Sequence, residues 1–111
     1  MRVSANPSRE KWDLSLYVSG KDHPTSQNAY ANVVRICEEH LPGEYSLTLV
    51  DVNQAPEIAI EEQILAVPTL IRRDPKPARR IIGDLADADR VLISLGVKAI
   101  SSHQALGTGL S

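Results

Sequence analysis

The sequence predicts a single α/β domain whose elements follow the order βαβαββα. The chain has 111 residues, 42% of them hydrophobic and none of them Phe, so Val, Ile and Leu must build one modest core. Apolar residues alternate in some segments with the period of a strand and recur in others at helical spacing. We expect one domain over residues 12–98, with a flexible lead at 1–11 and a flexible tail at 99–111.

The first half is predicted to form a βαβ unit. Residues 12–18 alternate apolar and polar side chains, which is the pattern of a strand. A helix is expected from about 27 to 41, with Thr25 or Ser26 as its N-cap. The next strand is expected at 45–52, parallel to the first because a helix separates the two.

The segment 53–65 has an ambiguous pattern. Pro56 stands where a helix can begin, and Ile60 and Ile64 are four residues apart, as on one face of a helix. Ile58 and Ile60, however, also alternate as in a strand. We expect a short helix here.

Two short strands, 69–73 and 79–82, are predicted to pair as an antiparallel hairpin across a Pro-rich break. Asp84 is placed to cap a final helix, and Gly96 to end it in the left-handed conformation. The apolar residues of this helix share one face: Leu85, Ala88, Leu92 and Leu95. Residues 91–95 are nevertheless also good strand material.

Charge and hydropathy restrict the class of partner. The net charge is −2, so no overall basic field draws the protein to nucleic acid or to an anionic membrane. No segment has the length of a signal-peptide core or of a membrane span. We expect a cytoplasmic protein.

The step Val67-Pro68-Thr69 resembles the one that thioredoxin-like folds carry beside their active site, and a cis bond is expected before Pro68. Dithiol chemistry is not expected, because the loop 19–26 has no cysteine and Cys37 falls on the apolar side of the first helix. A glutathione-type site is an alternative that would need a hydroxyl near the helix start. The candidates are Tyr17, Ser19, Thr25 and Ser26, for which capping and packing are the favoured roles.

Other polar groups give weaker signals. The spacing of the histidines does not bring ligands together, so we expect no metal and no cofactor: His23, His40 and His103. One basic cluster is predicted to be a solvated hairpin, with an anionic partner as the alternative: Arg72, Arg73, Lys76, Arg79 and Arg80. Glu57, Glu61 and Glu62 form an acidic patch that suits a basic partner surface.

Along residues 12–98 the chain resembles the KaiB family of circadian clock proteins. The resemblance is carried by Leu14 to Gly20, by Tyr45 to Val52, and above all by two runs in this order and spacing: Ile64-Leu-Ala-Val-Pro-Thr-Leu70 and Arg79-Arg-Ile-Ile-Gly-Asp-Leu85. It implies a thioredoxin-like protein without catalysis that binds a hexameric KaiC-type ATPase. It further implies other clock proteins as partners, with a histidine kinase as a different partner of a divergent member, and a homo-oligomer, either a dimer or a tetramer. The role lies in the clock or in stress and metabolic signalling.

The resemblance also suggests which residues bind the ATPase. The segment after the second strand contributes to that surface in the family, and Pro56, Glu61 and Glu62 match its pattern. The neighbouring Asn53, Gln54 and Glu57 complete the expected partner-binding set. The alternative function, from another class, is a glutathione-dependent or thioredoxin-like oxidoreductase or transferase.

Finally, the resemblance implies two folds for one sequence, a ground state and a thioredoxin-like state that differ in the C-terminal half. The expected hinge residues are Pro68, Gly83, Asp84, Ser94 and Gly96. Clock members carry Gly where this chain has Ser94 and Asp where it has Gly96. Ser favours a helix over Gly, and Gly96 supplies a helix stop, so we expect this chain to rest in the thioredoxin-like state. The family's tail is also replaced here, which puts a tetramer in doubt.

Overall fold

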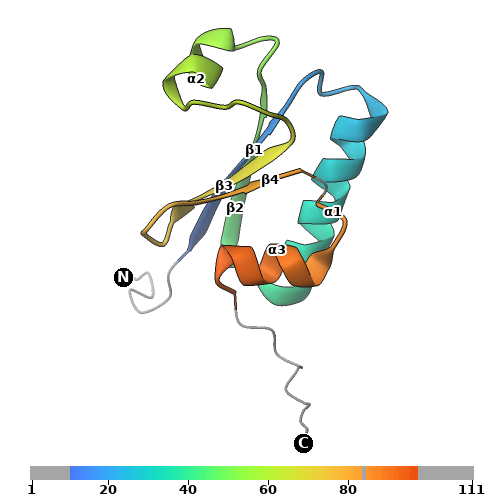
Figure 1. Cartoon of the computed structure of the whole chain (residues 1–111). Coiled ribbons are helices and arrows are strands. Elements are labelled where there is room, and N and C mark those ends of the chain that lie inside the picture. Colours follow the sequence, from blue (N-terminus) through green and yellow to red (C-terminus); the bar gives the residue numbers. More distant parts are fainter. Residues whose placement is uncertain (1–10, 84, 98–111) are drawn as a thin grey trace, which may run out of the picture.

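A computed structural model describes residues 11–83 and 85–97 of the chain (Figure 1). Its elements are β1 (Trp12–Val18), α1 (Pro24–His40), β2 (Tyr45–Asp51), α2 (Pro56–Glu61), β3 (Thr69–Asp74), β4 (Arg79–Ile82) and α3 (Ala88–Leu95). The predicted order βαβαββα is confirmed. The ambiguous segment 53–65 does contain a short helix.

The four strands form one mixed sheet in the order β2-β1-β3-β4. β1 pairs in parallel with β2 from Trp12↔Tyr45 to Val18↔Asp51, and in antiparallel fashion with β3. β3 and β4 form the expected antiparallel hairpin, with Thr69 opposite Ile82. β1 is therefore an interior strand that is paired on both sides, and β2 and β4 are the edges.

The hydrophobic core lies between one face of the sheet and the two longer helices. α1 and α3 lie on the same side of the sheet, whereas α2 lies away from both (Figure 1). β1 contributes Leu14, Leu16 and Val18 to this core because alternate residues of a strand point to the same face. The helices contribute apolar residues at helical spacing: Ala29, Val33, Ile36, Cys37, Val91, Leu92 and Leu95.

On the opposite face of the sheet, side chains of the interior strands β1 and β3 are also withdrawn from solvent. Ser15 and Tyr17 alternate with the core residues of β1, and both are buried. Ile71 of β3 is buried next to Ser15 in the strand register. This second face carries the groups that contact the end of α2.

The predicted start of α1 was wrong. The helix begins at Pro24, not near 27, and its N-cap is His23, whose Nδ1 accepts a hydrogen bond from the Thr25 N–H at 3.1 Å. Proline is favoured in the first helical turn because its missing N–H would have no partner there. Thr25 and Ser26, the predicted caps, lie inside the first turn.

The predicted start of α3 was also wrong. Asp87 is the N-cap, and its Oδ1 accepts a hydrogen bond from the Arg90 N–H at 3.2 Å. The predicted cap, Asp84, lies outside the described residues. The predicted end is confirmed, because Gly96 is left-handed with φ of 81° and its N–H donates to the carbonyl groups of Leu92 and Ile93.

The expected lead and tail fall, apart from Lys11, outside the described residues, as does position 98, so those domain limits stay predictions. Within residues 11–83 and 85–97, no helix has the length and apolar character that crossing a membrane requires.

Candidate functional site

The predicted partner-binding residues lie on the loop after β2 and on α2. Asn53 and Gln54 are exposed in the loop, and Pro56, Glu57 and Glu61 are exposed on α2. Glu62 differs, because it directly follows α2 and its side chain is only 34% exposed. The structure thus presents five of the six predicted residues to solvent and turns the sixth toward the sheet.

Two apolar side chains on this surface were missed by the sequence reasoning. Ile60 is 78% exposed and Leu65 is 92% exposed. They line a shallow hollow of about 540 Å³ together with Ala59, Gln63 and Ile64. We call Ile60, Leu65 and the flanking Glu57 and Glu61 the α2 surface. It combines apolar residues with carboxylates at its border, which is the composition of many protein-binding patches.

A signal for the exposed apolar residues is present in the sequence. Residues 58–67 contain Ile58, Ile60, Ile64, Leu65 and Val67. A helix of six residues can bury only one narrow stripe, so some of these side chains had to remain in solvent. The expectation that Ile60 and Ile64 share one face of a helix was wrong, because α2 ends at Glu61.

Asp51 fixes the loop that leads into α2. Its Oδ1 accepts hydrogen bonds from the N–H groups of Gly20 at 2.9 Å and Asn53 at 3.0 Å, and its Oδ2 accepts one from Lys21 at 2.9 Å. These bonds, the one from Gly20 first, hold the pKa of the Asp51 carboxyl below its ordinary value. Ser19 Oγ adds a bond to Asn53 Oδ1 at 3.3 Å. The end of β2 is thereby tied to the loop after β1.

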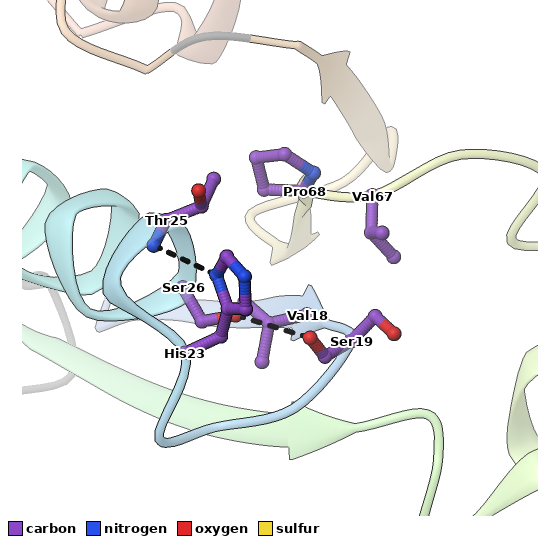
Figure 2. Close-up of a pocket in the computed structure, with 7 residues that line it drawn as sticks. All are labelled: Val18, Ser19, His23, Thr25, Ser26, Val67 and Pro68. Carbon is purple, nitrogen blue, oxygen red and sulfur yellow. Dashed lines mark hydrogen bonds between the residues drawn. The ribbon is translucent and has the colours of Figure 1, made fainter.

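A pocket of about 330 Å³ lies beside Pro68, where the loop after β1 meets the start of β3 (Figure 2). The Val67–Pro68 peptide is cis, as predicted. Figure 2 shows His23 directed to Thr25 and the Ser26 hydroxyl directed to Ser19, whose carbonyl oxygen it meets at 3.4 Å. These polar groups are thus engaged in holding the turn that opens α1.

Three of the four candidates for a glutathione-type hydroxyl lie in one pocket, and the fourth, Tyr17, does not. Ser19, Thr25 and Ser26 line the pocket beside Pro68. Tyr17 is buried on the second face of the sheet, where its hydroxyl accepts a hydrogen bond from Arg73. The one cysteine of the chain, Cys37, is buried in the core, as predicted, and burial followed by the charge of Glu38 raises its pKa to about 11. The pocket therefore has no thiol.

The expected hinge residues fall at the ends of elements. Pro68 precedes β3, and its carbonyl oxygen accepts a hydrogen bond from the N–H of Gly83, which follows β4, at 3.1 Å. Gly83 has φ of 107°, and Gly96 is left-handed after α3. Ser94 lies in the last turn of α3. Their role as hinges stays a prediction.

The basic cluster is divided between the two faces of the sheet, so its description as a solvated hairpin was wrong for part of it. Arg72 is buried on the core face, 5.5 Å over the Trp12 ring. Arg73 and Arg80 contact the end of α2 from the second face. Lys76 and Arg79 are exposed, as expected. Among the described residues, no group of three His, Cys, Asp or Glu side chains is arranged to hold a metal ion.

Comparison with known sequences gives one consistent result. The model of the KaiB domain family matches residues 15–97. The circadian clock protein KaiB3 of Synechocystis sp. is 43% identical over 84 residues, which are 76% of this chain and 81% of that protein. The circadian clock oscillator protein KaiB of Nostoc sp. is 44% identical over 90 residues, which are 81% of this chain and 82% of that protein.

Comparison with solved structures supports the fold. The N-terminal domain of SasA from Synechococcus elongatus superposes with a TM-score of 0.66 and 22% identity, over 86% of this chain and 93% of that one. Chloroplastic thioredoxin z superposes with a TM-score of 0.61 and 20% identity, over 81% and 80%. The fold is therefore thioredoxin-like, as the sequence predicted.

Proposed function

The chain belongs to the KaiB family of circadian clock proteins, and from this premise we propose that it is a non-catalytic binding protein that docks on a hexameric KaiC-type ATPase through the α2 surface. The observation that carries the proposal is the pair of exposed apolar side chains, Ile60 and Leu65, on the segment that the family resemblance already assigns to the partner. An Ile or Leu side chain contributes about 1.5–3 kcal/mol when a partner removes it fully from water.

The charges of the α2 surface suggest what the partner presents. Glu57 and Glu61 are exposed next to Ile60. Of the three glutamates of the acidic patch, Glu62 is the one that forms a salt bridge with an arginine. A complementary partner would offer an apolar depression for Ile60 and Leu65 and lysine or arginine side chains around it. Such border charges accelerate association and select the partner.

The alternative, a glutathione-dependent or thioredoxin-like enzyme, would act at the pocket beside Pro68. Dithiol chemistry requires a reactive thiolate, and the single cysteine is buried away from that pocket with a raised pKa. The pocket hydroxyls of Ser19 and Ser26 already take part in hydrogen bonds of the loop. These features favour the binding protein.

Sedimentation of the purified protein with a hexameric KaiC-type ATPase and ATP tests the proposal. We expect a complex larger than the ATPase alone, and the protein by itself in the same experiment reports its own oligomeric state. Absence of a complex would count against docking. The enzyme would be favoured if no ATPase complex forms and the protein is retained on a glutathione column, with this retention lost in Thr25→Ala. A complex with a histidine kinase but not with the ATPase would show that the kinase is the partner.

A further inference from the structure

α2 is not anchored by a hydrophobic core. None of its residues is buried, and it lies apart from α1 and α3 (Figure 1). Its N-cap, Ala55, makes no side-chain capping bond. A helix of six residues is not stable in water by itself, so other contacts must hold it against the sheet.

Glu62 supplies the first of these contacts. Its Oε1 lies 3.3 Å from Nη1 of Arg73 in β3, and both side chains are about one third exposed. Glu57 and Glu61 are exposed on α2 itself. The three carboxylates of the acidic patch are therefore not equivalent, since Glu62 is directed at the sheet.

Arg73 is itself held from the interior strand of the sheet. Its Nε donates to the hydroxyl of Ser15 at 3.0 Å, and its Nη2 donates to the hydroxyl of Tyr17. Ser15 and Tyr17 are buried residues of β1. The planar guanidinium thus has two of its nitrogens fixed by the sheet and presents the third to Glu62.

Arg80 of β4 holds the main chain at the same point. Its Nη1 donates to the carbonyl oxygen of Gln63 at 3.0 Å, and its Nη2 donates to the carbonyl oxygen of Glu62. Gln63 has φ of 57°, a left-handed conformation that is unfavourable for residues other than Gly. Glu62 and Gln63 directly follow α2, so Arg80 holds the main chain where it leaves the helix.

We propose that Arg73 is a positioning residue for partner docking, which acts through Glu62 to hold the α2 surface in its binding orientation. Glu62 then belongs to the support of that surface and makes no contact with the partner, while Glu57 and Glu61 contact it. This inference rests on the proposed docking function. It changes the role of one residue in the predicted partner-binding set.

The test uses Glu62→Gln and Arg73→Met in the full chain, with Glu57→Gln as the matched control carboxylate. The first measurement is hydrogen exchange of the amides of residues 58–64 in the free protein. We expect exchange to rise about threefold in Glu62→Gln and about tenfold in Arg73→Met, because the latter loses a network of charged hydrogen bonds. Glu57→Gln removes only a charge from the first turn of α2, so it should raise the exchange of these amides less than Arg73→Met does.

The second measurement is the association and dissociation rate with the KaiC-type ATPase at several salt concentrations. A carboxylate that faces the partner steers association, so Glu57→Gln should slow association and reduce its salt dependence. Glu62→Gln should leave that salt dependence unchanged and accelerate dissociation. The double variant Glu62→Gln/Arg73→Met should dissociate no faster than Arg73→Met alone, because both changes break one linkage.

Two results would overturn the inference: unchanged exchange of residues 58–64 in Arg73→Met, or a loss of salt dependence in Glu62→Gln equal to that of Glu57→Gln. Glu62→Gln keeps the bonds of Arg73 to β1 and so remains informative if Arg73→Met does not fold. If the wild-type protein forms no complex but the variants show the expected increases in exchange, the docking function is refuted. The support of α2 by Arg73 would still stand.

Discussion

The guanidinium of Arg72 in β3 holds the end of α3, since its Nη1 donates a hydrogen bond to the carbonyl oxygen of Leu95 at 2.5 Å. Its Nη2 donates to the carbonyl oxygen of Pro77, in the turn between β3 and β4, also at 2.5 Å. The side chain is 5% exposed and lies over the Trp12 ring. One buried arginine therefore joins the last helix, the hairpin and the first strand.

Replacement of Arg72 should destabilise the fold. In Arg72→Met the apolar stem remains, but the Leu95 and Pro77 carbonyl groups lose a charged donor. Hydrogen bonds to charged groups contribute about 1.5–3 kcal/mol each, so the loss of both should lower the free energy of unfolding by about 3–6 kcal/mol. Urea denaturation measures this free energy of unfolding. The exposed Arg79→Met on the same hairpin should change stability by less than about 0.5 kcal/mol, and an equal loss in both variants would contradict this role of Arg72.

Gly96 and Gly43 provide a matched pair of left-handed glycines, with φ of 81° and 72°. Alanine is unfavourable in this conformation by about 1 kcal/mol, which is the loss of stability expected for Gly43→Ala, where a new Cβ meets open space. At Gly96 the new Cβ would lie 2.9 Å from Nη1 of Arg72, which is fixed by its bond to Leu95. Gly96→Ala should therefore lower the free energy of unfolding, measured by urea denaturation, clearly more than Gly43→Ala does. Equal losses of stability at the two sites would show that the Arg72 side chain moves away from the new Cβ at little cost.

The resting fold can be measured directly in solution. We propose that the chain rests in the thioredoxin-like state, with residues 88–95 helical, supported by the Asp87 cap and the Gly96 stop. Secondary chemical shifts over 88–95 should be those of a helix. Ser94→Gly should lower the helical shifts, because Gly costs helix stability. Strand shifts over 88–95 in the wild-type protein would contradict the proposal.

The pH dependence of stability should include a contribution from Asp51. Its pKa is lowered in the folded protein by the N–H groups of Gly20, Lys21 and Asn53, from an ordinary value of 3.8. A lowered folded pKa stabilises the protein at pH above the unfolded pKa, and this stability is lost as the pH falls through the folded pKa.

Asp51→Asn should therefore be less stable than the wild type at neutral pH, and the difference should shrink as the pH falls below about 4. Thermal unfolding at a series of pH values measures this difference. Asp22→Asn, an exposed change in the nearby loop, serves as the control. A difference between wild type and Asp51→Asn that stays constant with pH would contradict the assignment.

Periodicity predicted the strands and helices well because the core depends on it. The alternation in Trp12–Val18 identifies the face of β1 that joins the core, and the helical spacing of Val33, Ile36 and Cys37 identifies the buried face of α1. Helix starts were less predictable. Several polar residues near each start could cap it, and only the path of the backbone selected His23 and Asp87.

The contacts of the predicted partner-binding residues could not be predicted from the sequence. The resemblance placed the predicted partner-binding residues on and around α2, but Glu57, Glu61 and Glu62 look alike in sequence. The inward direction of Glu62 depends on Arg73, which reaches it from β3, and on Ser15 and Tyr17 of β1. Arg72 and Arg73, although adjacent, point to opposite faces because they belong to a strand. Such long-range contacts have no local signal.

The affinity of two variants for a hexameric KaiC-type ATPase tests docking through the α2 surface most directly. Ile60 on α2 and Ile93 on α3 are almost equally exposed, at 78% and 76%, so Ile60→Asp and Ile93→Asp add the same charge to surfaces of different elements. We predict that Ile60→Asp weakens binding roughly tenfold or more, while Ile93→Asp binds like the wild type. Wild-type affinity in Ile60→Asp, or a larger loss in Ile93→Asp, would contradict docking through α2.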